Sequence, residues 1–177
     1  MKRLNLGCGT DIRGGWVNLD VAPLKGVDVV HDLNMLPLPF ENDEFDYILC
    51  KDILEHFEYL PLLRELHRIL KRGGIMEICV PHFTSQDNFI DPTHKKLFSF
   101  QTFSFFVTDA KFKRDYYFDF HFSKILSSRI TFHKGFFFYN YLVEPLVNLG
   151  APAKKLFEAT VLSRLFPAYN ILVKIEK

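Results

Sequence analysis

The first fifty residues contain four short apolar runs, and a glycine or an aspartate follows each run within two residues. The runs occupy residues 4–6, 16–19, 27–30 and 45–50. Short apolar runs of this kind are typical of strands buried in a parallel sheet. Residues 7–15 are too few for the crossover helix that normally joins two parallel strands, so we expect a loop in its place.

The rest of the chain alternates helical and strand patterns. Apolar residues between Leu62 and Leu70 fall on one face of a helix, and Lys71-Arg72-Gly73-Gly74 supplies basic last-turn residues and a glycine stop. The remaining patterns predict a strand at 75–80, a helix at 99–106, a strand at 118–122 that continues at 129–133, a helical segment at 135–149 broken or kinked at Pro145, a helix at 152–165 and a last strand at 170–175. We expect a single α/β domain over residues 1–177, with a first half at 1–81 and a second half at 82–177.

Composition argues against several classes of protein. The 22 Lys and Arg residues nearly balance the 21 Asp and Glu residues, for a net charge of +1, so nucleic acid is an unlikely partner. Cys8, Cys50 and Cys79 form no Cys-x-x-Cys pair and predict free thiols in a reducing compartment, which favours the cytoplasm. Asn5 and Gly7 interrupt the apolar start, so no signal peptide is expected, and no apolar stretch is long enough for a transmembrane segment.

Residues at the predicted strand ends point to a nucleoside site. Gly7 and Gly9 would let the backbone approach a ligand, and Asp20 is placed to accept hydrogen bonds from both ribose hydroxyls. Asp32 could accept a hydrogen bond from an exocyclic amine. A dinucleotide is not favoured, because the loop after Gly9 lacks the third glycine of the Rossmann fingerprint and carries Asp11, which would repel a pyrophosphate.

Segments of the first half occur in the order and spacing of a known family. They read Leu4-Asn5-Leu6-Gly7-Cys8-Gly9, Asn18-Leu19-Asp20, His31-Asp32-Leu33, Leu38-Pro39-Phe40 with Glu44-Phe45-Asp46, Ile53-Leu54-Glu55-His56, and Leu66-His67-Arg68-Ile69-Leu70-Lys71-Arg72-Gly73-Gly74. Through them, residues 3–81 resemble the class I S-adenosylmethionine-dependent methyltransferases. The resemblance implies a Rossmann-like, seven-stranded and mostly parallel sheet with an antiparallel last strand, flanked by helices, and it implies S-adenosyl-L-methionine as the cofactor.

The resemblance also implies which residues hold that cofactor. Its methionine part would lie over Gly7 and Gly9 with Asn5 and Cys8 beside them, its ribose at Asp20 and Val21, its adenine at Asp32 and Leu33, and its sulfonium near Lys51 and Asp52. Two positions depart from the family. Asn5 stands where many members carry an acid, which limits its contribution to hydrogen bonding, and Arg72 stands where proline is common.

The segment from Pro81 to His94 should arch over the methyl group. Methyl transfer to a hydroxyl requires alignment and a proton acceptor, and a histidine has a suitable pKa. We predict His94 as the main catalytic residue, because Asp91 and Thr93 could fix its tautomer, with His82 as the second candidate. A contact between Asp91 and His94 that only stabilises the loop is an equal alternative.

No metal site is expected in this segment, because its acids and histidines match no tight metal-binding spacing; they are His82, Asp87, Asp91 and His94. Glu55-His56 is interpreted mainly as a helix-start contact that packs the loop, with a direct role as the lesser alternative.

The predicted function is O-methylation of a small molecule, a sugar or glycan, or a lipid-linked acceptor. The Asp/Asn-Pro-Pro-aromatic signature of many nucleic-acid amino methyltransferases is missing after residue 50. Two other functions stay open: a catalytically silent cofactor-binding partner, and an aminopropyl transferase on the same fold. The second would need several acids for a polyamine, and residues 81–106 supply only Asp87 and Asp91.

Phenylalanine is unusually abundant, and 13 of the 20 phenylalanines lie between Phe98 and Phe138. These rings could fill the core, cap the acceptor pocket, or form a surface with interleaved basic residues that binds an anionic, lipid-linked or single-stranded ligand; the basic residues are Lys111, Lys113, Arg114, Lys124, Arg129 and Lys134. The segment from Phe136 to Glu144 predicts an apolar helix that covers the pocket, meets a second subunit or touches a membrane surface.

Overall fold

The computed structural model describes residues 1–108 and 115–177, so Lys111, Lys113 and Arg114 of the aromatic stretch lie outside the described residues. Seven strands form one sheet in the order β3-β2-β1-β4-β5-β7-β6. They are β1 (Arg3–Leu6), β2 (Val17–Asp20), β3 (Val29–Val30), β4 (Phe45–Lys51), β5 (Leu70–Pro81), β6 (Lys124–Ile130) and β7 (Asn170–Glu176).

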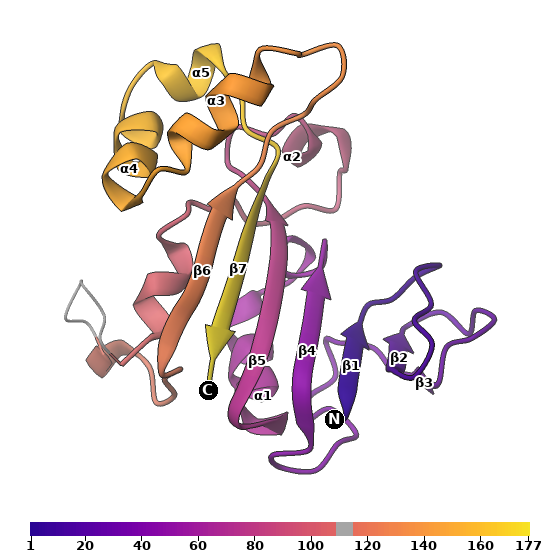
Figure 1. The fold of residues 1–177 in the computed structure, drawn as a ribbon. Helices are drawn as coiled ribbons and strands as arrows, with labels where there is room; N and C mark the ends of the chain where they lie inside the picture. Colours follow the sequence, from indigo (N-terminus) through magenta and orange to yellow (C-terminus); the bar gives the residue numbers. More distant parts are fainter. Residues whose placement is uncertain (109–114) are drawn as a thin grey trace.

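The first five strands are parallel, and the last strand is antiparallel. Parallel pairing joins β3, β2, β1, β4 and β5, whereas β7 runs antiparallel between β5 and β6 (Figure 1). The predicted fold class is therefore confirmed. The strand order reverses between β1 and β4, and ligands of open parallel sheets bind at the carboxyl ends of the strands at such a point.

Helix α1 (Tyr59–Ile69) lies against one face of the sheet (Figure 1). The apolar positions that predicted this helix are buried, and they share one core with the inward-facing side chains of the strands, among them Ile48 and Ile78. The helix ends at Ile69 and β5 begins directly at Leu70, earlier than the strand start predicted at residue 75.

The opposite face of the sheet carries polar side chains, and no helix within the described residues crosses it (Figure 1). On this face Tyr47 donates a hydrogen bond to Glu77, and Lys174 forms an ion pair with Glu77 at 3.2 Å. The expected loop between the first two strands is confirmed, because residues 7–16 contain no helix.

Short helices gather beyond the carboxyl ends of the parallel strands (Figure 1); they are α2 (Asp87–Ile90), α3 (Asn140–Val147), α4 (Ala151–Ala159) and α5 (Leu162–Leu165). A second, smaller core lies beneath them, built around Ile130, Phe132 and Phe157. The helix predicted at 135–149 is shorter and continues through Pro145 to Val147. The helix predicted at 152–165 was wrong as one unit, because the extended backbone of Thr160 ends α4 before α5 begins.

The phenylalanine-rich stretch forms less regular structure than its pattern predicts. The strand predicted at 118–122 was wrong: only Phe122 bridges to Val107, and β6 starts at Lys124. Apolar and polar residues alternate from Phe118 to Phe122, which predicts that the phenylalanines face the core, and Phe120 and Phe122 are indeed buried while Asp119 is exposed. Most rings from Phe98 to Phe106 are buried as well, in and around the 3₁₀ helix η2 (Thr102–Phe106), so core filling accounts for much of the stretch.

The segment before α3 exposes several large apolar side chains. The helix predicted from Phe136 begins only at Asn140, and Phe136 is 91% exposed, Phe138 75% and Leu142 72%. Within residues 1–108 and 115–177, no helix is long and apolar enough to cross a membrane.

Candidate active site

The two glycines after β1 have different surroundings. Gly9 has a φ of 49°, which favours glycine, and a Cβ at this position would meet nothing within 4 Å. Gly7 has a φ of 61°, and its Cβ would lie 1.9 Å from Cδ1 of Ile53. Gly7 therefore allows close packing against the segment after β4, and Gly9 opens onto free space that can admit a ligand.

Asp20 ends β2 and faces this loop. Its Oδ2 accepts a hydrogen bond from the backbone N–H of Gly9 at 2.7 Å, and its Oδ1 accepts one from Ala22 at 3.0 Å. Each carboxylate oxygen keeps a free lone pair, so Asp20 can still accept hydrogen bonds from two hydroxyl groups. Val21, beside it, is 63% exposed.

Asp32 and Leu33 follow β3. Asp32 accepts hydrogen bonds from the backbone and side-chain N–H groups of Asn34, and these bonds lower the pKa of the Asp32 carboxyl. Leu33 is buried and lines a cavity of about 160 Å³ together with Phe57 and Leu62. An apolar wall beside a carboxylate suits an adenine ring.

Asn5 and Cys8 support the loop from below. Nδ2 of the buried Asn5 donates to the backbone oxygen of Asp11 at 2.7 Å and to Oδ1 of Asn18 at 3.2 Å. The backbone N–H of Cys8 donates to Leu19 at 2.9 Å, and burial followed by the Asp20 charge raises the pKa of the Cys8 thiol. These positions favour support of the cofactor loop over direct contact by the two side chains.

Lys51 is the last residue of β4, and Asp52 follows it. Strand β4 lies between β1 and β5 in the sheet. Lys51 is exposed. The backbone N–H of Asp52 donates to Cys79 at 2.9 Å, which joins this turn to β5, and burial raises the pKa of the Asp52 carboxyl.

A cavity of about 230 Å³ opens at the ends of β4 and β5. Its lining combines acids with imidazoles and a phenol: Asp52, Glu55, His56, Pro81, Asp87, Ile90, Asp91, His94 and Tyr169. The predicted catalytic residue His94 is among them, and so is Asp52 from the predicted cofactor set. Four carboxyl groups meet in this space, because Asp52 and Glu55 join the two acids of the later segment.

Glu55 is the most unusual of these groups. It lies in the 3₁₀ helix η1 (Leu54–His56), is fully buried, and neither carboxyl oxygen has a hydrogen-bond partner among the described residues. Burial, reinforced by Asp52 and Asp91, raises the pKa of Glu55 to about 8. Its backbone oxygen accepts hydrogen bonds from Lys95 and Lys96, so the predicted loop-packing contact exists through the main chain.

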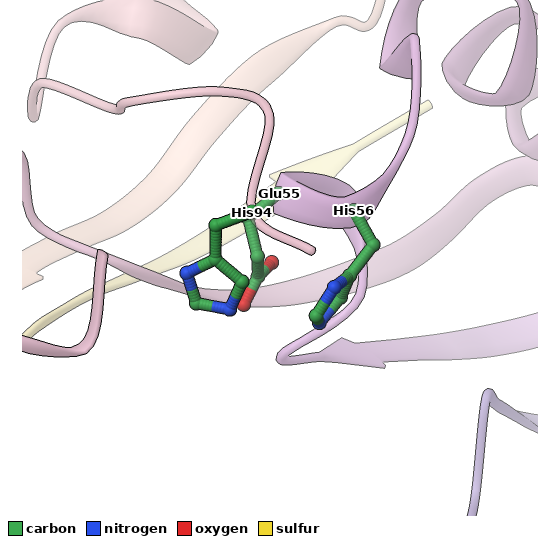
Figure 2. A group of neighbouring side chains, drawn as sticks. All are labelled: Glu55, His56 and His94. Carbon is green, nitrogen blue, oxygen red and sulfur yellow. The ribbon is translucent and has the colours of Figure 1, made fainter. Parts of the chain in front are cut away.

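Two histidine rings stand beside Glu55 (Figure 2), with their centroids 4.7 Å apart. Thr93 was expected to orient His94, but its hydroxyl pairs with Nδ1 of His56 at 2.8 Å. Asp91 does approach His94, with 3.8 Å between Oδ2 and Nε2. Burial, followed by the neighbouring His94, lowers the pKa of His56.

His82 has different surroundings from His94. It is fully buried, with Nδ1 paired to Thr84 Oγ1 at 2.7 Å and Nε2 paired to Glu158 Oε1 at 3.0 Å. Both ring nitrogens are thus engaged by the protein, in a contact that ties the end of β5 to α4. This position favours a packing role for His82 over proton transfer.

Most of the predicted cofactor residues thus lie at the ends of β1, β2 and β3, with Lys51 and Asp52 at the end of β4, and the cavity lies at the ends of β4 and β5, across the point where the strand order reverses. This layout fits the fold of the class I S-adenosylmethionine-dependent methyltransferases that residues 3–81 resemble. S-adenosyl-L-methionine is the cofactor of this class, as predicted, and the open backbone at Gly9 opposite the Asp20 carboxylate fits a nucleoside of this kind.

Comparison with known proteins gives the same class. Residues 4–78 match the family model described as a methyltransferase domain. A demethylmenaquinone methyltransferase of Lysinibacillus sphaericus is 37% identical over 81 residues, which cover 45% of this chain and 32% of that protein. An uncharacterized protein of Methanocaldococcus jannaschii is 47% identical over 47 residues, or 27% of this chain and 21% of that protein.

The fold likeness extends over the whole chain. A SAM dependent methyltransferase from Archaeoglobus fulgidus superimposes with a TM-score of 0.55 at 18% identity, covering 99% of this chain and 86% of that one. The family match over residues 4–78 and the fold likeness both agree with the resemblance found in the sequence. The sequence matches cover about a third or less of the curated relatives' length.

Three residues that line the cavity were not predicted as site residues: Glu55, His56 and Tyr169. Glu55-His56 was assigned mainly to packing, although a glutamate between Leu54 and Phe57 in an apolar segment is a signal of a buried acid. Tyr169 gave no signal in the sequence, because it is the residue before β7 and only the fold brings it to the cavity.

Proposed function

We propose that this chain transfers a methyl group from S-adenosyl-L-methionine to a hydroxyl group of an acceptor bound in the 230 Å³ cavity. One observation carries the proposal. Asp52 belongs both to the predicted cofactor set and to the cavity lining, so an acceptor in the cavity would lie next to the end of the cofactor that carries the methyl group. The topological switch point provides the same proximity in other open α/β sheets.

The cofactor supplies an electrophilic methyl carbon on a positively charged sulfur. The chain must hold the acceptor oxygen in line with that carbon and help to remove its proton. The oxygen then forms a bond to carbon, the carbon–sulfur bond breaks, and its electron pair stays on sulfur. We assign the activation of the hydroxyl to His94, either by taking the proton or through an ion that it binds.

The cavity lining supports a polar acceptor. Four carboxyl groups and Tyr169 can accept or donate hydrogen bonds to several hydroxyl groups of a sugar or a similar small molecule. The match to the demethylmenaquinone methyltransferase covers 45% of this chain and 32% of that protein, so it does not identify the acceptor. The acids also exceed what residues 81–106 supply alone, so a polyamine acceptor is the competitor to be tested.

The experiment is a thermal-shift screen of sugars, glycan precursors and amines in the presence of S-adenosylhomocysteine, followed by transfer of radiolabelled methyl to each hit. We expect hydroxyl compounds to stabilise the protein and to gain label. Stabilisation by polyamines alone, without label transfer, would contradict the proposal. Failure to bind S-adenosylhomocysteine, or tight binding of NAD, would contradict the assignment of the cofactor.

A further inference from the structure

The cluster of Glu55, His56 and His94 has unused bonding capacity at the inner end of the cavity (Figure 2). Glu55 is fully buried, and neither of its carboxyl oxygens has a hydrogen-bond partner in the part of the chain that the structure describes. A buried carboxyl group without any hydrogen bond is costly, so native structures rarely keep one without a ligand or a function. The side chain points toward the two imidazoles, which makes this end of the cavity a site rather than a packing defect.

The hydrogen bonds of His56 fix its tautomer. Thr93 Oγ1 donates its only proton to Asp91 Oδ1 at 2.6 Å, so it must accept a hydrogen bond from Nδ1 of His56 at 2.8 Å. The proton of a neutral His56 ring is then on Nδ1, and Nε2 keeps a free lone pair. A histidine held in this way through an oxygen is typical of metal ligands.

His94 offers a second free nitrogen. Its Nε2 faces Glu55 and His56 (Figure 2) and lies 3.8 Å from Asp91 Oδ2, beyond hydrogen-bond distance, whereas its buried Nδ1 points away from the cluster. Asp91 therefore orients His56 through Thr93, and its carboxylate lies near His94 without a hydrogen bond to it. One ligand atom from each residue of the cluster lies within 4.8 Å of the other two.

We propose that Glu55, His56 and His94 bind a divalent transition-metal ion such as Zn²⁺. Two imidazoles and one carboxylate suit such ions, and the calcium and magnesium ions prefer oxygen ligands. Ligand bonds of about 2.0 to 2.2 Å require the three side chains to close by about 1 Å through rotation. The sequence gave no metal pattern because the ligands come from two segments, η1 and the loop after α2.

The role of the ion rests on the proposed function. An ion at this place would bind the acceptor hydroxyl and lower its pKa, so that its proton leaves to water before the oxygen attacks the methyl carbon. The carbon–sulfur bond then breaks with its electrons on sulfur, as above. His94 would then activate the hydroxyl through the ion.

The test is calorimetric titration of chelator-treated, untagged protein with Zn²⁺, and separately with Mg²⁺. We expect one Zn²⁺ per chain, and at least about 100-fold weaker binding in Glu55→Gln and in His56→Gln. Titration with Co²⁺ should produce visible absorption bands of an ion with few ligands, which depend on no activity. His121→Gln is the matched control, because His121 also has a buried unpartnered nitrogen but lies beside α1, far from the cavity.

Circular dichroism shows which variants are folded, and His56→Gln, which changes a partly exposed side chain, covers the case in which Glu55→Gln fails to fold. Absence of Zn²⁺ binding, or equal binding in the folded cluster variants, would overturn the metal site. Methyl transfer that survives full removal of metal would overturn its role and leave the proposed function standing. Zn²⁺ binding with no transfer to any acceptor would support the site and contradict the function.

Discussion

The carboxyl groups on the two sides of the point where the strand order reverses differ in their hydrogen bonding. At the ends of β2 and β3, Asp20 and Asp32 receive hydrogen bonds from nearby N–H groups. At the ends of β4 and β5, the Glu55 carboxyl group has no hydrogen-bond partner among the described residues, and burial raises the pKa values of both Glu55 and Asp52. The carboxylates on the proposed cofactor side are thus hydrogen-bonded before a ligand binds. On the proposed acceptor side, reactive groups stay without hydrogen bonds among the described residues until a ligand binds.

The largest expected effect concerns the cavity at the ends of β4 and β5. His94→Ala should lower turnover by roughly 10² to 10⁴, because the acceptor hydroxyl loses its activating group. The affinity for S-adenosylhomocysteine should stay nearly the same, which calorimetry can check. A loss of rate accompanied by loss of fold would instead support the loop-stabilising alternative.

The next largest effect concerns Asp20, whose carboxylate is hydrogen-bonded at the end of β2. Asp20→Ala should weaken S-adenosylhomocysteine binding by about 1.5 to 3 kcal/mol, the range for a lost hydrogen bond to a charged group. Asp43→Asn is a suitable control, because Asp43 lies before β4, at the opposite end of that strand, and pairs with Lys177. Equal affinities in wild type and Asp20→Ala would remove Asp20 from the cofactor site.

The third prediction compares the pH dependence of stability. The pKa of Glu55 is raised on folding, so between its unfolded value and about 8 the unfolded chain binds fewer protons than the folded chain. Stability is therefore lost as pH rises through this range, by at most about 1.4 kcal/mol per pH unit for one group. Glu55→Gln should remove this loss.

Denaturant titrations of both proteins with a chelator, at several values between pH 5 and pH 8, measure the difference. The lowered pKa of His56 acts in the opposite direction at the acid end, which is why the comparison with Glu55→Gln is needed. A constant difference between the two proteins across this range would show that Glu55 is not held protonated.

The smallest expected effect on stability concerns the exposed apolar segment. Replacing Phe136 and Leu142 with serine should change the free energy of unfolding by less than about 0.5 kcal/mol, because both side chains are exposed. The same change should reduce self-association or binding to liposomes, whereas Met35→Ser, at another exposed position, should not. Light scattering and flotation distinguish the two. If the wild-type protein is a monomer and does not bind liposomes, covering the pocket is the remaining role for the exposed apolar side chains around Phe136 and Leu142.

Sequence patterns predicted the parts of the fold that local rules decide. Helix α1, the parallel strands and the antiparallel β7 follow from apolar periodicity and the family resemblance. The alternation at Phe118, Phe120 and Phe122 predicted the buried face but not the backbone, because a strand also needs a hydrogen-bonded neighbour and only Phe122 has one. That neighbour is a property of the tertiary structure.

The same limit applies to the candidate site. The residues at the ends of β1–β3 could be named from the sequence, because one short motif places each of them. The cavity could not, because Glu55 and His56 meet His94 only when the loop after α2 folds back over η1. Neither segment alone carries the spacing of a ligand set.

The helix-free connection between β1 and β2 has a thermodynamic consequence for the cofactor. Side chains hold this loop in place of a helix: Asn18 bonds Arg13 and Asp28, and Asn5 bonds Asp11. Local opening of such a loop is governed by a few hydrogen bonds, so its amide protons should exchange with solvent faster than those of β4 and β5. Any opening lowers the fraction of molecules ready to bind, and the apparent dissociation constant for the cofactor rises by the inverse of that fraction. We therefore expect the buried Asn5 and Asn18 to influence the affinity for the cofactor without contacting it.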